Sequence, residues 1–137
     1  MNIIAYTDGG ARNNPGPAGI GVSILDADTG EQVEEHSEYL GETTNNQAEY
    51  RAVILALERA IDLGAKTFEL RTDSKLVVEQ MNGNWKVKEP GIQDRFREAQ
   101  KLCQQLSGCT FVHVPRAQNA KADELANKAM DRGMGMD

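Results

Sequence analysis

The segment TDGGARNNPGPAG, residues 7–19, contains four glycines and two prolines directly after an apolar run. Residues 2–8, NIIAYTD, and residues 18–27, AGIGVSILDA, flank it with the short β-branched pattern of strands. Because glycine and proline favour turns, the segment predicts two strands joined by a tight connection. Asp8 is expected at the end of the first strand, where its charge needs a partner from elsewhere in the chain.

The pattern changes from strand-like to helical after the third predicted strand. Residues 28–30, DTG, predict a turn, and residues 31–40 predict a polar strand, so the first three strands suggest an antiparallel meander. From residue 46 to residue 63 the apolar residues follow a helical period, which Gly64 ends. The further predicted elements are a strand at 66–73, helices at 74–83 and 91–108, a strand at 109–115 and a helix at 119–132.

This order of elements predicts an α/β fold. A meander followed by parallel crossovers describes a mixed five-stranded sheet with helices on both faces. One domain is expected over residues 1–132, and residues 133–137, GMGMD, are expected to form a flexible tail.

Composition and net charge restrict the possible functions of the chain but do not identify one. The formal net charge of −6 argues mildly against nucleic-acid binding, but residues 13–50 hold eight acidic and no basic residues, while residues 51–137 hold fourteen Lys or Arg against twelve Asp or Glu. No apolar run of 18 residues and no signal-peptide pattern occur, so we expect a cytoplasmic protein that does not bind membranes. Cys103 and Cys109 either close a small loop or remain reduced thiols, and reduced thiols are favoured.

Four carboxylates occupy positions that a purely structural interpretation explains poorly. Asp8 and Asp73 are expected at the ends of two strands, where ligand sites form in α/β sheets. Glu49 shares one face of its helix with apolar residues, which directs it toward the sheet; the alternative is that it completes a capping box begun by Asn46. Asp123 falls in the first turn of the last helix, where the helix dipole alone could also favour it.

Cations would stabilise such a cluster. Three or four carboxylates at one end of a sheet repel one another and lose hydration unless positive charge holds them. An all-oxygen ligand set favours Mg²⁺ or Mn²⁺ over Zn²⁺. Two such ions about 4 Å apart would indicate phosphoryl transfer or phosphodiester hydrolysis.

Four motifs resemble the type 1 ribonuclease H family, in the order and spacing of that family from Asn2 to about Arg132: TDGGARNNPGPAGIGV, TTNNQAEYRAVILAL, RTDSKLVVEQMNG and VPRAQNAKADELANKA. The resemblance implies a ribonuclease H-like fold and an endonuclease that hydrolyses the RNA strand of RNA–DNA hybrids, leaving 5′-phosphate and 3′-hydroxyl ends. It implies a monomer with two Mg²⁺ ions, for which Mn²⁺ can substitute. The implied metal ligands and catalytic residues are Asp8, Glu49, Asp73 and Asp123.

The same resemblance implies substrate contacts. The family's contacts to the RNA strand fall on Gly9, Gly10 and Asn14, whose small size suits approach to 2′-hydroxyl groups, although NNPGPAG is also an ordinary turn sequence. Contacts to bases and backbone in the minor groove fall on Asn45, Asn46 and Gln47, and phosphate contacts fall on Thr44 and Ser74.

The chain departs from many family members in two places. The loop before the last helix, PRAQNA, has no histidine; Arg116 either steadies a phosphate there or is a solvated cation, and His113 is expected to be a structural histidine of the last strand. Residues 82–93 are too short for a basic protrusion, so Trp85, flanked by Lys86 and Lys88, either contacts the DNA strand or anchors the core. We therefore expect weak, salt-sensitive substrate binding.

Alternative functions remain open at this point. One is a nuclease of the same fold that acts on other nucleic acids, such as a resolvase or transposase core. Another is a non-catalytic hybrid-binding module, although a binding module has no need of a repelling carboxylate cluster. A plain acidic interaction domain leaves the strand-end acids unexplained.

Overall fold

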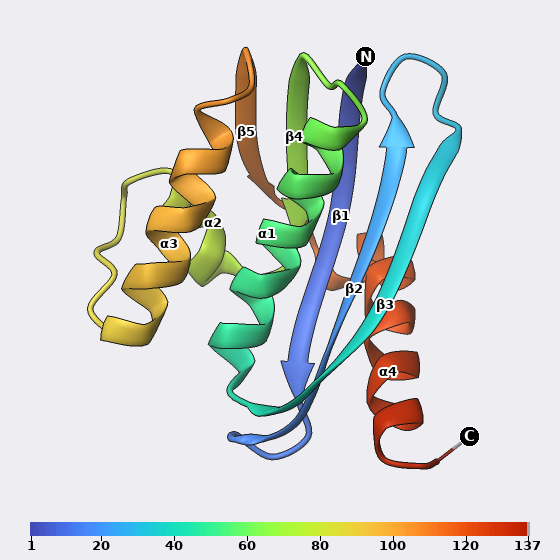
Figure 1. Cartoon of the computed structure of the whole chain (residues 1–137), viewed down its shortest axis with the longest axis vertical. Helices are drawn as coiled ribbons and strands as arrows, with labels where there is room; N and C mark the ends of the chain where they lie inside the picture. Colours follow the sequence, from blue (N-terminus) through green and yellow to red (C-terminus); the bar gives the residue numbers. More distant parts are fainter. Residues whose placement is uncertain (137) are drawn as a thin grey trace.

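The computed structural model describes residues 1–136 as a twisted sheet flanked by helices (Figure 1). The strands are β1 (Asn2–Ala11), β2 (Gly16–Asp26), β3 (Gln32–Thr43), β4 (Thr67–Thr72) and β5 (Gly108–His113). The helices are α1 (Asn45–Asp62), α2 (Lys75–Met81), α3 (Pro90–Cys103) and α4 (Ala120–Gly133), with a short 3-10 helix η1 (Arg116–Gln118) before α4. Within the described part of the chain, no helix is both long and apolar enough to cross a membrane.

The sheet has the predicted mixed topology. Its strand order is β3-β2-β1-β4-β5, with β1 and β2 antiparallel, β2 and β3 antiparallel, and both β4 pairings parallel. The meander and the parallel crossovers are thus confirmed. The largest boundary error is at α3, which ends at Cys103 because residues 104–106 turn back toward the sheet and Ser107 N then bonds Lys66 O at 2.9 Å.

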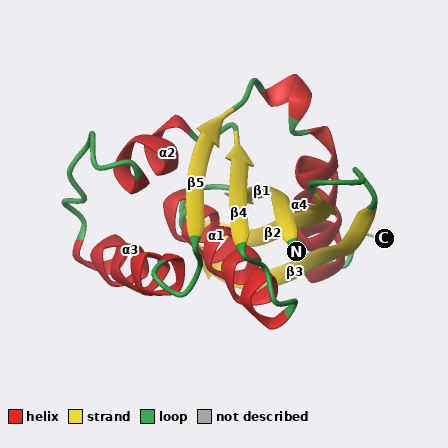
Figure 2. Ribbon diagram, turned by 90° about the horizontal axis from the view of Figure 1, so that it is seen from above, coloured by secondary structure: helices red, strands yellow, loops and turns green. Residues whose placement is uncertain are grey.

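Helices α1 and α4 cover opposite faces of the sheet (Figure 2). In the β1–β2 pairing, Gly9 lies opposite Ile20 and Asp8 lies opposite Gly21. A Cβ on Gly9 would collide with the backbone of α1, whereas a Cβ on Gly21 would collide with the backbone of α4. Since neighbouring strand residues point to opposite faces, Gly9 faces α1 and Asp8 faces α4. Both glycines let a helix backbone approach the sheet closely.

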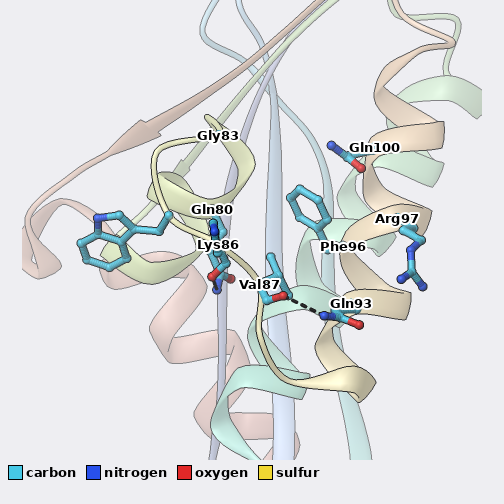
Figure 3. Close-up of a pocket in the computed structure, with 9 residues that line it drawn as sticks. Gln80, Gly83, Lys86, Val87, Gln93, Phe96, Arg97 and Gln100 are labelled. Atoms are coloured by element: carbon cyan, nitrogen blue, oxygen red, sulfur yellow. Dashed lines mark hydrogen bonds between the residues drawn. The ribbon is translucent and has the colours of Figure 1, made fainter.

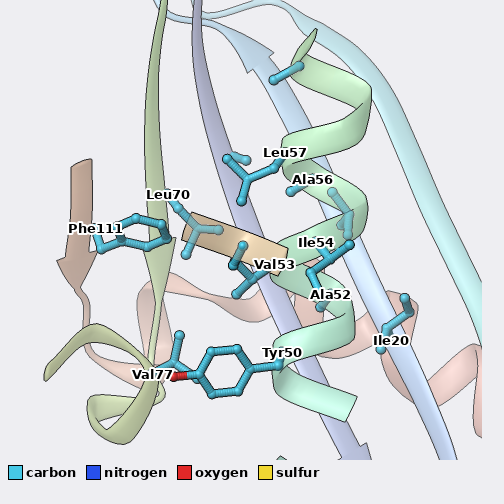
Figure 4. Packing of buried hydrophobic residues seen from close by; sticks show 14 of the residues in the cluster. Ile20, Tyr50, Ala52, Val53, Ile54, Ala56, Leu57, Leu70, Val77 and Phe111 are labelled. Carbon is cyan, nitrogen blue, oxygen red and sulfur yellow. The ribbon is translucent and has the colours of Figure 1, made fainter. Parts of the chain in front are cut away.

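The main core lies between α1 and the sheet (Figure 4). Val53 and Leu57 of α1 are fully buried and belong to one cluster with Leu70 of β4. Tyr50 is also buried, and its hydroxyl donates to Oε1 of Gln80 in α2 at 2.6 Å. This core orients the N-terminal half of α1, and with it Glu49, against β1.

An ion pair joins β3 to α1 at the far edge of the sheet. Arg59 Nε and Nη2 donate to the two carboxylate oxygens of Glu34, each at 2.8 Å, and His36 Nε2 lies 2.8 Å from Glu34 Oε1. These hydrogen bonds, first from Arg59 and then from His36, lower the pKa of Glu34 to about 2. The ionised carboxylate therefore stabilises the folded state.

We expect Glu34→Gln to lower the free energy of unfolding at pH 7 by about 1 kcal/mol, since screening at this partly exposed site reduces the roughly 3 kcal/mol that the pKa shift alone would imply. Because the folded pKa lies below the ordinary one, the stabilisation is complete above pH 4.5 and disappears as the pH falls toward 2. Urea unfolding at pH 7, 5, 3 and 2 measures this difference. Glu42→Gln, at an exposed position of the same strand, is the control, and an equal loss in both variants contradicts the role of the pair.

Candidate active site

Asp8 lies in β1 at the point where that strand loses its parallel neighbour. The prediction that Asp8 ends the strand was wrong, because β1 continues to Ala11 by pairing with β2. The pairing with β4 stops earlier, at Tyr6 and Arg71. Asp73 directly follows β4, so the two aspartates come to the same end of adjacent strands, as expected for a ligand site in an α/β sheet.

A cavity of about 280 Å³ opens at this end of the sheet. Three of the four predicted carboxylates line it, contributed by β1, by the residue after β4 and by the first turn of α4. The lining residues are Asp8, Gly9, Gly10, Ala11, Arg12, Asn45, Asp73, Arg116, Asp123, Asn127 and Met130. Glu49, the fourth carboxylate, is not part of this lining, but its burial and then the charges of Asp8 and Asp73 raise its pKa.

The carboxylates destabilise one another's charged forms. Burial, the negative charges of Asp73 and Asp123, and a hydrogen bond with Asp123 together raise the pKa of Asp8 to about 7. Burial and then the charges of Asp8 and Asp73 hold the pKa of Glu49 well above its usual range, although hydrogen bonds from Gly9 N–H and the Ser74 hydroxyl oppose the shift. The two groups thus share one unfavourable negative field, which a bound cation would relieve.

The donor chemistry fits Mg²⁺ or Mn²⁺, but the side chains are not arranged around an ion. All four candidate ligands are carboxylates, the oxygen donors that these ions prefer. Among residues 1–136, however, no group of three or more His, Cys, Asp or Glu side chains is placed so that it could hold a metal as it stands.

Asn119 is a site residue that the sequence did not predict. It is buried, and its Nδ2 donates to Oδ1 of Asp73 at 2.8 Å and to the carbonyl oxygen of Thr7 at 2.9 Å. In the sequence, an asparagine four residues before Asp123 looks like an ordinary helix cap. Nothing in that local pattern distinguishes a cap from a contact to Asp73.

Arg12 and Asn127 also line the cavity without having been predicted. Arg12 pairs with Asp131 of α4 at 2.6 Å and donates to Oδ1 of Asn127 at 3.2 Å. The Nδ2 of Asn127 donates to the carbonyl oxygen of Asp123 at 2.9 Å. These bonds fasten the connection after β1 to α4. Met134, in the segment expected to form a flexible tail, also approaches the connection after β1, because its Sδ lies 3.5 Å from Arg12 Nη1. Asp137 lies outside the described residues.

The predicted substrate residues nearest the cavity are connected by hydrogen bonds. Asn14 Oδ1 accepts from the backbone N–H of Asn45 at 3.0 Å, and Asn45 Oδ1 accepts from the backbone N–H of Ala11 at 2.7 Å. The two asparagines therefore hold the β1–β2 connection against the start of α1. Arg116 lies 3.8 Å from Asp123 Oδ1 with 80% of its side chain exposed, so it remains accessible to a ligand.

The start of α1 differs from the proposed capping box. Thr44, not Asn46, is the N-cap, and its hydroxyl accepts from the backbone N–H of Gln47 at 3.2 Å. The sequence does contain this pattern, since Thr44 and Gln47 have the Ser/Thr-x-x-Glu/Gln spacing. Glu49 therefore lies beyond the cap, and capping does not explain it.

The other predicted contacts lie along α1 and α2. Asn46 is inside α1 and lines a second cavity beside α2 and α3. The Gln47 side chain accepts from Arg95 of α3 at 3.2 Å. Ser74 is the N-cap of α2, and its hydroxyl accepts from the backbone N–H of Val77 at 3.4 Å. It lies close enough to Glu49 to oppose the rise in the pKa of that carboxyl.

Trp85 and His113 are both more exposed than expected. Trp85 is 44% exposed, so its interpretation as a core anchor is wrong. Its ring lies 5.9 Å from Lys75 Nζ, and it lines a cavity of about 390 Å³ between the segment after α2 and α3. Figure 3 shows the opposite wall of that cavity, where Gln93 donates to the carbonyl oxygen of Val87 at 2.9 Å. His113 is exposed on the edge strand and is not a buried structural histidine.

Comparisons with known proteins agree with this architecture. The chain matches the family model described as reverse transcriptase-like over residues 6–129. It is 47% identical over 131 residues to the bifunctional protein Rv2228c of Mycobacterium tuberculosis, covering 96% of this chain and 36% of that protein. It is 45% identical over 129 residues to ribonuclease HI of Halobacterium salinarum, covering 94% of this chain and 64% of that protein. The chain thus spans less than two thirds of either relative.

Solved structures give the same result. The N-terminal RNase H domain of Rv2228c, solved as a fusion with maltose binding protein, has a TM-score of 0.93 and 46% identity, covering 96% of this chain and all of that chain. LC11-RNase H1 in complex with an RNA/DNA hybrid has a TM-score of 0.91 and 48% identity, covering 97% and 99%. This sheet order, with carboxylates where β1 and β4 end their pairing, defines the ribonuclease H-like class. The chain belongs to the reverse transcriptase-like family and, within it, to the type 1 ribonucleases H.

Proposed function

We propose that the chain is a divalent-metal-dependent endoribonuclease that hydrolyses the RNA strand of RNA–DNA hybrids, leaving 5′-phosphate and 3′-hydroxyl ends. The observation that carries the proposal is the cavity in which Asp8, Asp73 and Asp123 meet. A chain 48% identical to this one, LC11-RNase H1, has been solved with an RNA/DNA hybrid, which supports the substrate class.

The proposed metal ligands are Asp8, Glu49, Asp73 and Asp123, with Mg²⁺ as the ion and Mn²⁺ as a substitute. Bound divalent ions supply Lewis-acid stabilisation of the charge that develops on the attacking and leaving oxygens. Burial and the charges of neighbouring carboxylates raise the pKa of Asp8 and of Glu49, and a bound cation would relieve this repulsion.

The remaining polar groups of the cavity position the hybrid. Gly9 and Gly10 line the cavity, and the open space beside Gly10 suits close approach of an RNA 2′-hydroxyl, while Gly9 is a proposed contact through its backbone. Asn45 lies in the same cavity, and the exposed Arg116 is placed to pair with a phosphate. Asn14, Thr44, Asn46, Gln47 and Ser74 are further proposed contacts near the start of α1 and α2.

Cleavage of a labelled RNA–DNA hybrid tests the proposal directly. We expect cleavage of the RNA strand with Mg²⁺ and none with EDTA, and end analysis should find 5′-phosphates. Duplex RNA and branched DNA, assayed beside the hybrid, distinguish a nuclease of the same fold with another substrate. Tight hybrid binding without cleavage in any divalent ion would instead indicate a non-catalytic binding module.

Trp85 is proposed to stack on the DNA strand. Its exposed ring lies next to Lys75, and Lys86 and Lys88 follow it in the chain, which combines an aromatic face with positive charge. No basic protrusion accompanies it, so few phosphates are contacted and the affinity is expected to be weak.

We expect Trp85→Ala to raise the dissociation constant of a hybrid about tenfold, since one base loses its stacking partner. Fluorescence anisotropy of a labelled hybrid in EDTA measures binding without cleavage. Wild-type affinity should fall about tenfold or more between 50 and 200 mM salt, because the remaining contacts are largely ionic. Tyr39→Ala, at another exposed aromatic residue, is the control. An unchanged dissociation constant in Trp85→Ala, or a salt-independent one in the wild type, contradicts the proposed surface.

Three wider expectations remain proposals. We infer that residues 1–132 form the catalytic domain, that the protein acts as a monomer, and that it works in the cytoplasm. The single continuous sheet supports the first.

A further inference from the structure

Asn119 joins three elements beside the acidic cavity. It follows η1 and directly precedes α4, and it is 1% exposed. Its Nδ2 donates to the Thr7 carbonyl of β1 at 2.9 Å and to Oδ1 of Asp73 at 2.8 Å. A single buried amide therefore connects β1, the end of β4 and the start of α4.

The side chain of Asn119 does not cap helix α4, which is the usual role of an asparagine at this position. An N-cap asparagine accepts a hydrogen bond from a backbone N–H in the first turn through its Oδ1. Helix α4 has no such side-chain cap bond, and Asn119 Oδ1 is buried without a hydrogen-bond partner among the described residues. Leaving a buried acceptor unpaired is unfavourable. Stabilisation of the helix terminus therefore does not account for this side chain.

The neighbours of Asn119 determine its orientation. Both groups that face Nδ2 are acceptors, a backbone carbonyl and a carboxylate oxygen, so the NH₂ group must point toward them. An aspartate at this position has no N–H to donate and would add a negative charge beside Asp73. The bond to Thr7, the residue before Asp8, anchors the amide to β1, and the bond to Asp73 limits rotation of that carboxylate.

We propose that Asn119 is a positioning residue that holds the Asp73 carboxylate in the orientation that the reaction uses. The proposal rests on the function proposed above, in which Asp73 is a metal ligand. The hydrogen bond engages Oδ1 and leaves Oδ2 without a contact to Asn119, so the plane of the carboxylate is fixed while lone pairs remain for a cation in the cavity. Partners that orient metal ligands in this way typically affect metal affinity or activity 10–100-fold.

Two substitutions and a matched control test the proposal kinetically. Asn119→Asp should lower kcat for hybrid cleavage about 100-fold and Asn119→Ala about 10-fold, with KM changed less than about twofold. Asn2→Ala is the control, because Asn2 Nδ2 also donates to an aspartate, Asp28, at 3.4 Å, but at the opposite end of β1. A normal kcat in both Asn119 variants, or a loss confined to KM, overturns the proposal.

Two further measurements do not depend on activity. Calorimetric titration with Mn²⁺ should show affinity weakened about tenfold in Asn119→Ala, which removes the bond to Asp73 without adding charge, and unchanged in Asn2→Ala. In the wild type, the charge-assisted bond should shift the Asn119 side-chain amide proton downfield in NMR spectra, and Asp73→Asn should move that resonance upfield, whereas Asp28→Asn should not. An amide resonance insensitive to Asp73→Asn overturns the proposal even if the Asn119 variants fail to fold.

These measurements separate the two proposals. If the wild-type chain cleaves no hybrid but the Asn119 resonance and the Mn²⁺ affinity respond as expected, the proposed function fails and the positioning of Asp73 stands. If the chain cleaves hybrids but neither Asn119 variant alters kcat, the positioning role fails and the function stands.

Discussion

Replacement of Asp73 by asparagine is expected to lower the rate of hybrid cleavage by about 10³-fold or more, the scale on which removal of an essential group acts. Asp73 lines the cavity together with Asp8 and Asp123, and its carboxylate is one of the proposed metal ligands. Asparagine has nearly the same shape but no charge. The substitution therefore removes cation binding with little change in packing. Single-turnover cleavage of a labelled hybrid measures the effect.

The same substitution should leave the fold intact or stabilise it. The charge of Asp73 raises the pKa of both Asp8 and Glu49, so its removal relieves repulsion within the cluster. We expect the free energy of unfolding without metal to rise by up to about 1 kcal/mol at pH 7. Asp28→Asn, in the turn between β2 and β3, controls for the loss of one negative charge. Near-normal turnover in Asp73→Asn would refute the assignment of the four carboxylates.

Gly9→Ala is expected to destabilise the protein by about 3 kcal/mol and to impair cleavage with it. A Cβ at this position would collide with the backbone of Ala48 and would lie 2.6 Å from the backbone nitrogen of Glu49. Backbone atoms of a packed helix cannot move aside as a flexible side chain does. Helix α1 would have to shift away from β1, which would separate Glu49 from Asp8. Urea unfolding and the cleavage assay together measure the two effects.

Gly10→Ala is the matched control for stability. The nearest atom to a Cβ at Gly10 is Asn45 Oδ1 at 3.8 Å, an ordinary contact distance. We expect this variant to change the free energy of unfolding by less than about 0.5 kcal/mol. Equal losses in the two glycine variants would show that the close approach of β1 and α1 is not what requires Gly9.

Gly9 and Gly10 are adjacent in the sequence but have different surroundings in the structure. In the sequence, Gly9 and Gly10 are indistinguishable members of one glycine-rich segment, and the motif predicts substrate contact for both. In the structure, Gly9 faces α1 and permits helix packing, whereas Gly10 has open space beside it. Successive strand residues point to opposite faces of the sheet, so the two glycines have different neighbours. Which of them lies against a helix depends on what covers each face.

The sequence by itself determined the order of elements and the mixed sheet, and it singled out four carboxylates as candidate metal ligands. Strand and helix periods, glycine stops and turn residues act over a few positions, so they can be recognised locally. Local patterns predicted the end of α3 and the cap of α1 incorrectly. The ends of a helix depend on which backbone and side-chain groups pair with its unpaired N–H and C=O groups.

The tertiary structure alone decided how the carboxylates meet and what holds them. The hydrogen bonds of Asn119 to Asp73 and Thr7 span 46 and 112 positions in the chain. The burial of Asp8 beside the charges of Asp73 and Asp123, which raises its pKa, and the exposure of Trp85 likewise follow from packing between distant segments. Such contacts form only when β1, β4 and α4 are brought together. The site therefore depends on strand pairing and on helix packing across the sheet, which no short segment of the sequence contains.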